Sequence, residues 1–173
     1  MSEAKYFGKY RGTVINNIDP ELKGRLMVMV PDVLSLIPST WAEACVPLAG
    51  PTGPPMGMYV VPPIGAGVWV EFENGDPDYP IWVGCRWGSP SDVPPIAHAG
   101  LPVSPNIVIQ SLGQNAIVVS DLPGPIGGII LKSLTGASII VNDTGIYIQN
   151  GKGASINMVG PAVTINNGAL TII

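Results

Sequence analysis

The stretch GIILKSLTGASIIVNDTGIYIQNGKGASI, residues 128–156, decides the fold, because it contains one short pattern twice. Gly128-Ile129-Ile130-Leu131 followed by Gly136-Ala137-Ser138-Ile139 returns 17 residues later as Gly145-Ile146-Tyr147-Ile148 followed by Gly153-Ala154-Ser155-Ile156. Self-similarity at a short period is typical of stacked β architectures, in which no single repeat can bury its own apolar face.

Looser copies of the pattern extend to both sides of this stretch. Upstream, residues 107–112 match residues 129–134, and a degenerate copy over residues 162–172 follows downstream. We count about eight candidate strands of four or five residues, separated by Gly, Asn, Asp or Pro turns. At an inter-strand spacing of ~4.8 Å, eight strands make a rod on the order of 40 Å long.

The frequency of charged residues falls sharply near residue 103. Beyond it only Asp121, Lys132, Asp143 and Lys152 are charged. A segment this apolar cannot leave both sheet faces in water, since each exposed methylene forgoes roughly 0.8 kcal/mol of burial. Three copies wrapped around a common axis supply the missing cover and hide the strand edges. We therefore predict a trimeric, intertwined β-helix or β-prism needle; the alternative is a β-sandwich with few charges.

The trimer interface is expected on alternating aliphatic positions of these strands. The predicted interface residues are Ile129, Leu131, Ile139, Val141, Ile146, Ile148, Ile156, Val163 and Ile165. Small residues of the repeat, such as Gly136 and Gly153, would allow three backbones to approach closely near the axis or at turns.

The N-terminal part predicts a small barrel. Leu26, Val28 and Val30 alternate with more polar neighbours and share one strand face. Five or six antiparallel strands in about 85 residues suit a closed Greek-key barrel of the OB type. The expected strands are 10–18, 24–30, 41–46, 58–61, 68–73 and 79–85, and the only short helix candidate is 32–40. The fold class is therefore all-β, with an OB domain over 1–90, a Pro-rich linker over 91–105 and a β-helical spike over 106–173.

Enzymatic chemistry finds little support in the residues. Glycosidases place two carboxyl groups across a cleft, about 5 to 10 Å apart. Glu71 and Glu73 are expected on one strand face, whereas Asp76 and Asp78 lie in a Gly/Pro turn that favours local hydrogen bonds. His98 stands alone in a Pro/Ala segment, and no phosphate loop or metal-ligand spacing appears. We expect no catalytic site, no metal site and no cofactor.

Binding of nucleic acid is disfavoured by charge. The net charge is −4, and no basic patch is apparent. Trp41, Trp69 and Trp82 have acidic or apolar neighbours, so packing in the core or between subunits is the better interpretation; Trp87 beside Arg86 is the exception. An OB-fold carbohydrate-binding or adhesin module remains the alternative function.

The remaining sequence features concern the cellular compartment in which the protein folds. No signal peptide and no membrane-spanning apolar run is expected. Cys45 and Cys85 form no ligand spacing and are expected to be buried free thiols in a reducing compartment, with a disulfide as the alternative.

Five blocks of the N-terminal part carry a family resemblance. Their order resembles the OB domain of contractile-tail spikes, namely the phage baseplate assembly protein V group and the VgrG proteins of type VI secretion. The resemblance covers about residues 5 to 90 by motif, and the tail resembles the family's trimeric β-helix in kind. The blocks are Gly8–Val14, Asp19–Leu26, Trp41–Glu43, Pro62–Phe72 and Gly75–Gly84.

The resemblance implies a homotrimeric structural spike of a virion tail baseplate or phage-tail-like particle, assembled in the bacterial cytoplasm. Its expected partners are the baseplate hub proteins and the target cell envelope, which the needle pierces on sheath contraction. Nucleic acid is not expected as a partner. The linker is too short for the lysozyme domain of some members, and the His-x-His iron apex of others is absent. The apolar end at Leu170, Ile172 and Ile173 is instead expected to dock a separate PAAR-like tip protein; alternatively, Ile172 and Ile173 complete the last strand pair.

Overall fold

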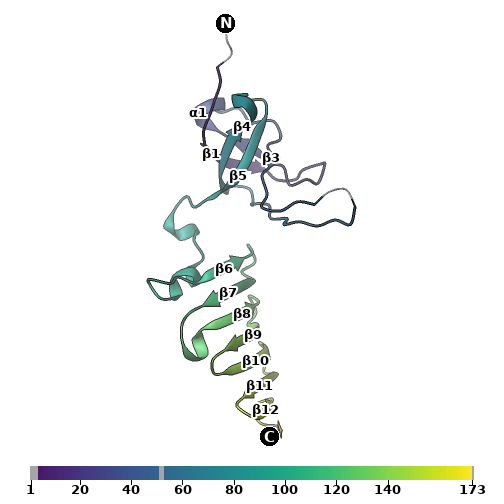
Figure 1. The fold of residues 1–173 in the computed structure, drawn as a ribbon, viewed down its shortest axis with the longest axis vertical. Coiled ribbons are helices and arrows are strands. Elements are labelled where there is room, and N and C mark those ends of the chain that lie inside the picture. Colours follow the sequence, from purple (N-terminus) through teal and green to yellow (C-terminus); the bar gives the residue numbers. More distant parts are fainter. Residues whose placement is uncertain (1–3, 51–52, 173) are drawn as a thin grey trace. The chain divides into compact units, whose positions relative to one another are not determined.

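The computed structural model describes residues 4–50 and 53–172 and consists almost entirely of strands and turns (Figure 1). Contacts between Cα atoms divide the chain into two compact units, Met1–Pro90 and Ser91–Ile173. Among the described residues, no helix is long and apolar enough to cross a membrane.

The first unit is a small, strongly curved sheet. Its five strands lie in the order β2-β1-β4-β5-β3, and β3 pairs with β5 in parallel. Leu26 and Ala42 exchange backbone hydrogen bonds of 3.1 and 2.7 Å, which join the β2 side of the sheet to the β3 side. The sheet thus closes on itself, as an OB barrel does. The strands are β1 (Tyr10–Asn16), β2 (Met27–Met29), β3 (Glu43–Ala44), β4 (Gly67–Phe72) and β5 (Pro80–Arg86).

Alternating residues of these strands fill the barrel. Val68, Val70 and Phe72 of β4 point inward and are buried, and the residues between them are half-buried. Burial of Leu26, Val28 and Val30 confirms the alternation predicted for that strand. The core cluster consists of Val14, Leu26, Val28, Val30, Ala42, Val68, Val70, Phe72 and Trp82.

Three sequence-based expectations for this unit are wrong in detail. The barrel strands were expected to be antiparallel, whereas β3 and β5 pair in parallel. The helix expected over 32–40 is the single turn α1 (Pro31–Leu34), which ends where Ser35 adopts a φ of 55°. Residues 58–61 form no strand. They instead follow a hairpin-like loop in which the Met58 N–H donates to the Leu48 carbonyl. The prolines at 54–55 and 62–63 have no N–H to donate to a ladder, so a strand over 58–61 cannot be extended at either end, which agrees with its absence.

The second unit is an antiparallel meander of eight strands, here named the needle sheet. Its order β13-β12-β11-β10-β9-β8-β7-β6 follows the chain without a crossover. The number of strands matches the count made from the repeats. The strands are β6 (Ile107–Gln110), β7 (Ala116–Ser120), β8 (Gly128–Lys132), β9 (Ala137–Asn142), β10 (Gly145–Asn150), β11 (Ser155–Val159), β12 (Ala162–Ile165) and β13 (Leu170–Ile172).

The Pro-rich segment before β6 contains local structure. Two short 3-10 helices span Pro90–Asp92 and Pro95–Ala99. The Asn106 backbone N–H donates to the Ala97 carbonyl at 3.2 Å, and its side-chain amide donates to the Ile96 carbonyl at 2.8 Å. These bonds fix the second helix to the chain that enters β6.

Candidate functional site

One face of the needle sheet carries almost only apolar side chains; among the strand residues the exception is Asn150, which pairs with Ala137 at the end of β10. Residues paired directly across antiparallel strands project to the same side, so the register can be followed from β6 to β13. We name this set the aliphatic face. It comprises Ile107, Ile109, Ile117, Val119, Ile129, Leu131, Ile139, Val141, Ile146, Ile148, Ile156, Met158, Val163, Ile165, Leu170 and Ile172.

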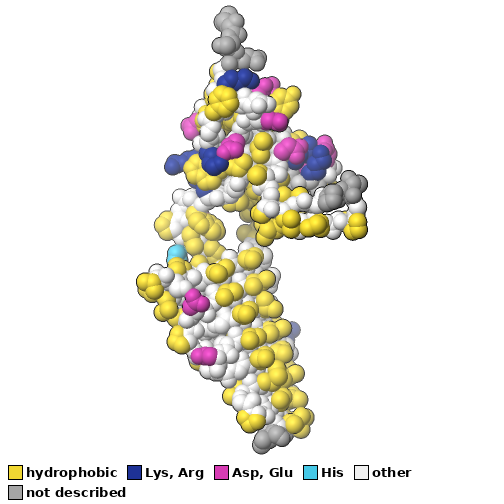
Figure 2. Space-filling model, in the orientation of Figure 1, with side chains coloured by type: hydrophobic (Ala, Val, Ile, Leu, Met, Phe, Trp, Pro, Cys, Tyr) yellow, Lys and Arg dark blue, Asp and Glu magenta, His cyan; other side chains and the backbone are white. Residues whose placement is uncertain are grey.

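Much of the aliphatic face is exposed in the isolated chain. The exposed fraction is 68% at Ile107, 42% at Ile139 and 39% at Ile156. Figure 2 shows hydrophobic side chains in rows over this unit. A contiguous apolar surface of this extent marks an interaction site, because a soluble monomer rarely leaves one uncovered.

All nine residues predicted for the trimer interface lie on the aliphatic face. They occupy β8 to β12, and each forms a register pair with another member of the face. The prediction missed Ile107, Ile109, Ile117, Val119 and Met158. The looser upstream repeat aligned the first four with later members, so strict alternation through that repeat would have found them.

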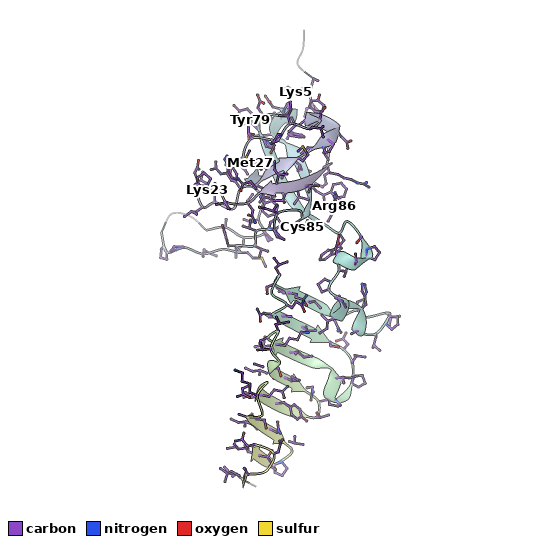
Figure 3. All side chains as sticks on the ribbon, turned by 180° about the vertical axis from the view of Figure 1, so that it is seen from behind. Lys5, Lys23, Met27, Tyr79, Cys85 and Arg86 are labelled. Carbon is purple, nitrogen blue, oxygen red and sulfur yellow. The ribbon has the colours of Figure 1, made fainter. Side chains whose placement is uncertain are left out.

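The opposite face of the needle sheet is mixed in character. Its central column runs from Val118 and Ile130 through Tyr147 to Asn157 and Thr164. Val118 is fully buried, whereas Asn157 and Thr164 are half-buried. The side chains on both faces can be followed in Figure 3. Apart from Asn150, only the aliphatic face is therefore apolar along its length, and it is the face that needs cover.

The residues predicted to dock a tip protein continue the same face. Leu170 pairs with Ile165, and Ile172 pairs with Val163, so both lie among the aliphatic residues of β13. Ile173 lies outside the described residues.

A groove of about 540 Å³ runs along the sheet near its turns, and its lining includes Ile109, Ile117, Leu131, Ile139 and Ile148.

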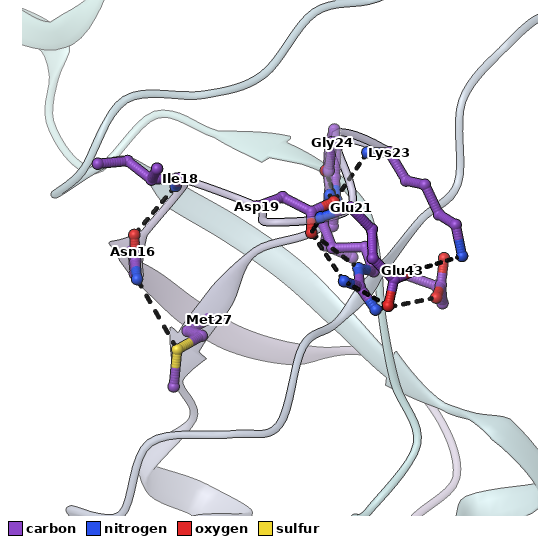
Figure 4. A network of polar contacts seen from close by, with 10 residues as sticks. Asn16, Ile18, Asp19, Glu21, Lys23, Gly24, Met27 and Glu43 are labelled. Atoms are coloured by element: carbon purple, nitrogen blue, oxygen red, sulfur yellow. Dashed lines mark hydrogen bonds and ion pairs between the residues drawn. The ribbon is translucent and has the colours of Figure 1, made fainter.

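The OB unit contains a dense polar network around the Asp19–Arg25 turn (Figure 4). The Arg25 guanidinium donates to Asp19 Oδ1 from Nη2 at 2.8 Å and from Nε at 3.1 Å. Backbone N–H groups of Glu21, Lys23 and Arg25 also donate to this carboxylate. The Arg25 guanidinium and these N–H groups hold the pKa of Asp19 well below its usual range. The network fixes a turn in which Leu22 and Gly24 have positive φ.

The carboxylates considered for catalysis serve local structure. Glu71 forms an ion pair with Lys9, and Asp76 accepts a hydrogen bond from the Asp78 N–H at 3.1 Å. Glu73 belongs to the 3-10 helix Glu73–Gly75, so the expectation that it shares a strand face with Glu71 is wrong. Across residues 4–50 and 53–172, no group of three or more His, Cys, Asp or Glu residues could hold a metal ion.

The tryptophans and cysteines of the OB unit include both buried and exposed residues. Trp82 is buried and donates from Nε1 to the Gly24 carbonyl at 3.0 Å, while the Arg25 guanidinium lies 5.7 Å from the Trp41 ring centroid. Trp87 is exposed. Cys45 and Cys85 are free but exposed, so the expectation that they are buried is wrong. Each lies just beyond or near the end of a strand, where the barrel no longer covers it.

Two family models match the chain and together span most of it. The type VI secretion system/phage-baseplate injector OB domain matches residues 10–87. The phage baseplate V C-terminal trimerisation domain matches residues 106–171, which contain nearly all of the needle sheet. No curated protein matches the chain. With a closed OB sheet and an uncovered aliphatic face in the two matched segments, the chain belongs to the phage baseplate V family of baseplate spike proteins.

Proposed function

We propose that this chain is the central spike of a contractile tail or injection machine. In this proposal three copies form one needle beneath the baseplate hub, and the needle pierces the target cell envelope when the sheath contracts. The copies assemble in the bacterial cytoplasm before they join the baseplate.

The aliphatic face of the needle sheet is the observation that supports the proposal most directly. Its 16 residues are all apolar, and Asn150 at the end of β10 is the one polar side chain of the described strands on that side of the sheet. Fully burying one Val, Leu or Ile side chain contributes about 1.5–3 kcal/mol. Three such faces turned toward a common axis cover one another and leave the mixed faces in water.

The mechanical role follows from how such a trimer would resist force. A needle that transmits an axial load must not lose strands one at a time. The backbone ladder of eight paired strands spreads the load within one chain, and apolar contact among three chains prevents any one from peeling away. The Asp19–Arg25 network would keep the OB turn rigid under the same load.

A separate PAAR-like tip remains part of the proposal. Leu170 and Ile172 are 52% and 57% exposed at the last strand of the needle sheet, which leaves one edge of β13 without a strand neighbour among the described residues. A tip protein would cover that apolar end. Because both side chains also continue the aliphatic face, their burial against the other two copies of the trimer is the competing explanation for their apolar character.

The solution mass of the purified chain tests the core of the proposal. Light scattering should give three times the chain mass of 18.0 kDa. An unheated gel should show an SDS-resistant band at the same stoichiometry. A monomer with the fold intact by circular dichroism would overturn the spike proposal and leave a lone OB-type module, for which a glycan array would then be the appropriate screen.

A further inference from the structure

We propose that the two long edges of the needle sheet bind each other between neighbouring copies. In this arrangement the edge that carries lysines meets the edge that carries aspartates, and the trimer closes as a head-to-tail ring of ion pairs. The inference rests on the proposed homotrimer and specifies how its copies recognise one another.

The meander defines the two edges. Because consecutive strands run in opposite directions, the turns alternate between the two sides of the sheet. One edge holds the turns 111–115, 133–136, 151–154 and 166–169, and the other holds 121–127, 143–144 and 160–161.

The four charges of this part of the chain are sorted by sign between the edges. Lys132 is the last residue of β8, and Lys152 lies in the turn after β10, so both lie at the first edge, here named the lysine edge. Asp121 follows β7 and Asp143 follows β9, so both lie at the second, here named the aspartate edge. Figure 2 shows acidic side chains along one edge of this unit and a basic one at the other.

Threefold symmetry brings unlike edges together. If each aliphatic face points to the axis and all three sheets run in the same direction, one edge of each sheet faces the other edge of the next. Such a contact is heterologous, and a 120° rotation closes it into a ring. The lysine edge of every copy then meets the aspartate edge of its neighbour.

The spacing of the charges agrees with this pairing. Lys132 and Lys152 are separated by about two and a half strands, or about 12 Å, and Asp121 and Asp143 by about two strands, or about 10 Å. Both pairs need an offset of half a strand to one strand along the axis. A threefold rotation adds no such displacement, so a tilt of the strands relative to the axis supplies it, and flexible lysine side chains absorb the small remainder.

The carboxylates are held in place but keep no cation of their own chain. Ser104 Oγ donates to Asp121, and the Gly124 N–H donates to Asp143 Oδ1 at 3.0 Å. In the described part of the chain, none of these two aspartates and two lysines has an ion-pair partner. Pre-oriented acceptors at one edge and unpaired cations at the other are complementary, which favours a second copy of this chain as the occupant.

Charge reversal tests the pairing in the full-length chain. The first variant carries Lys132→Glu with Lys152→Glu, the second carries Asp121→Lys with Asp143→Lys, and the third carries all four changes. The trimer dissociation temperature is measured for each variant and the wild type at 50 mM and 1 M NaCl. A neutral control, Asp121→Asn with Asp143→Asn, retains acceptor oxygens at both turns.

Either two-residue variant places like charges at all three contacts. We expect each to lower the dissociation temperature by roughly 5 °C or more at 50 mM salt, with most of the loss removed at 1 M salt by screening. The four-residue variant should return close to wild type. It contains the same altered turns as the aspartate variant, so its recovery cannot come from turn structure.

Equal dissociation temperatures for all charge variants would overturn the pairing while leaving the trimer intact. Failure of the four-residue variant to exceed both two-residue variants would overturn it as well. A wild-type chain that is monomeric would instead overturn the proposed function, so the two failures are distinguishable.

Zero-length cross-linking provides an independent readout. A carbodiimide joins a lysine amine to a carboxylate in contact through an amide bond with loss of water. Cross-linking a trimer mixed from isotopically light and heavy chains should give mixed-label peptides that join Lys152 to Asp143 or Lys132 to Asp121. Finding these lysines joined only within one chain, or to no carboxylate of the needle sheet, would contradict the proposal.

Discussion

Asp19 shows how one side chain organises a whole family block. Its carboxylate accepts five hydrogen bonds, two from the Arg25 side chain and three from backbone N–H groups. The chain must turn tightly between Asp19 and Arg25, with Leu22 at a φ of 57°. The Asp-Pro-Glu-Leu-Lys-Gly-Arg block is therefore a structural unit, in which the acid and the base at its two ends are each required by the other.

Replacing Asp19 with Asn should destabilise the OB unit. The amide loses the charge opposite Arg25 and presents N–H groups where the backbone also donates. We expect the unfolding midpoint of the unit to fall by on the order of 10 °C. Thermal unfolding followed by tryptophan fluorescence measures this, because Trp82 lies in the same core. Glu43→Gln is the matched control, since its carboxylate is exposed and 4.0 Å from Arg25.

The same network predicts a pH dependence. The folded-state pKa of Asp19 is lowered, so the stabilisation is present above the unfolded pKa of about 3.9 and is lost as the pH falls below it. The difference in unfolding midpoint between the wild type and Asp19→Asn should therefore shrink from pH 6 toward pH 2. A difference that stays constant over this range would show that the carboxylate charge contributes nothing.

Gly128 and Gly153 form a matched pair of glycines in the needle sheet. Both have positive φ, but a Cβ on Gly128 would lie 2.1 Å from the Val141 carbonyl oxygen, whereas nothing lies within 4 Å at Gly153. Gly153→Ala should cost about 1–2 kcal/mol of backbone strain per chain. Gly128→Ala adds a main-chain overlap and should cost roughly 1–3 kcal/mol more than Gly153→Ala. Chemical denaturation compares the two; equal losses would contradict the close approach.

At the scale of elements, β11 separates the two faces of the needle sheet within two adjacent residues. Ile156 lies on the aliphatic face and Asn157 on the mixed face. Ile156→Asp places three carboxylates at the proposed trimer axis, where an unpaired buried charge is not tolerated. We expect this variant to yield no trimer at micromolar concentration by light scattering. Asn157→Asp, one residue away, should remain a trimer, and loss of trimer in both variants would contradict the assignment of faces.

The elements differed in how far sequence alone predicted them. The needle strands were predictable because repeat period, turn residues and alternation agree there, and the nine predicted interface residues share one face. Where these signals disagree, prediction failed. The stretch 58–61 is apolar and β-prone, yet prolines at 54–55 and 62–63 leave it outside the sheet. The parallel pairing of β3 with β5 depends on barrel closure, which no local pattern encodes.

Identifying the whole aliphatic face required the strand register of the structure as well as the repeat pattern of the sequence. Ile107 and Ile109 belong to an upstream repeat with weaker identity, and only pairing with β7 places them on the aliphatic face. The exposure of Cys45 and Cys85 was likewise hidden from sequence, because both residues lie in apolar runs but near strand ends. The sorting of charges by edge becomes visible only once the alternation of turns is known.

At the scale of the whole molecule, the two units divide stability and assembly between them. The OB unit has a closed core of nine buried side chains and needs no partner to bury them. In the second unit, Ala116 and Val118 are the only buried hydrophobic residues among those the structure describes. One unit should therefore fold by itself, and the other should depend on association.

Separating the units tests this division. A chain ending at Pro90 should be a folded monomer with cooperative thermal unfolding. A chain beginning at Ser91 should form the trimer at micromolar concentration, because the aliphatic face and both edges lie within it. Its melting should also depend on protein concentration, as expected when folding and association are coupled. Light scattering and calorimetry of the two fragments measure these properties. A trimeric OB fragment, or a monomeric needle fragment with its strands intact, would move the origin of assembly away from the needle sheet.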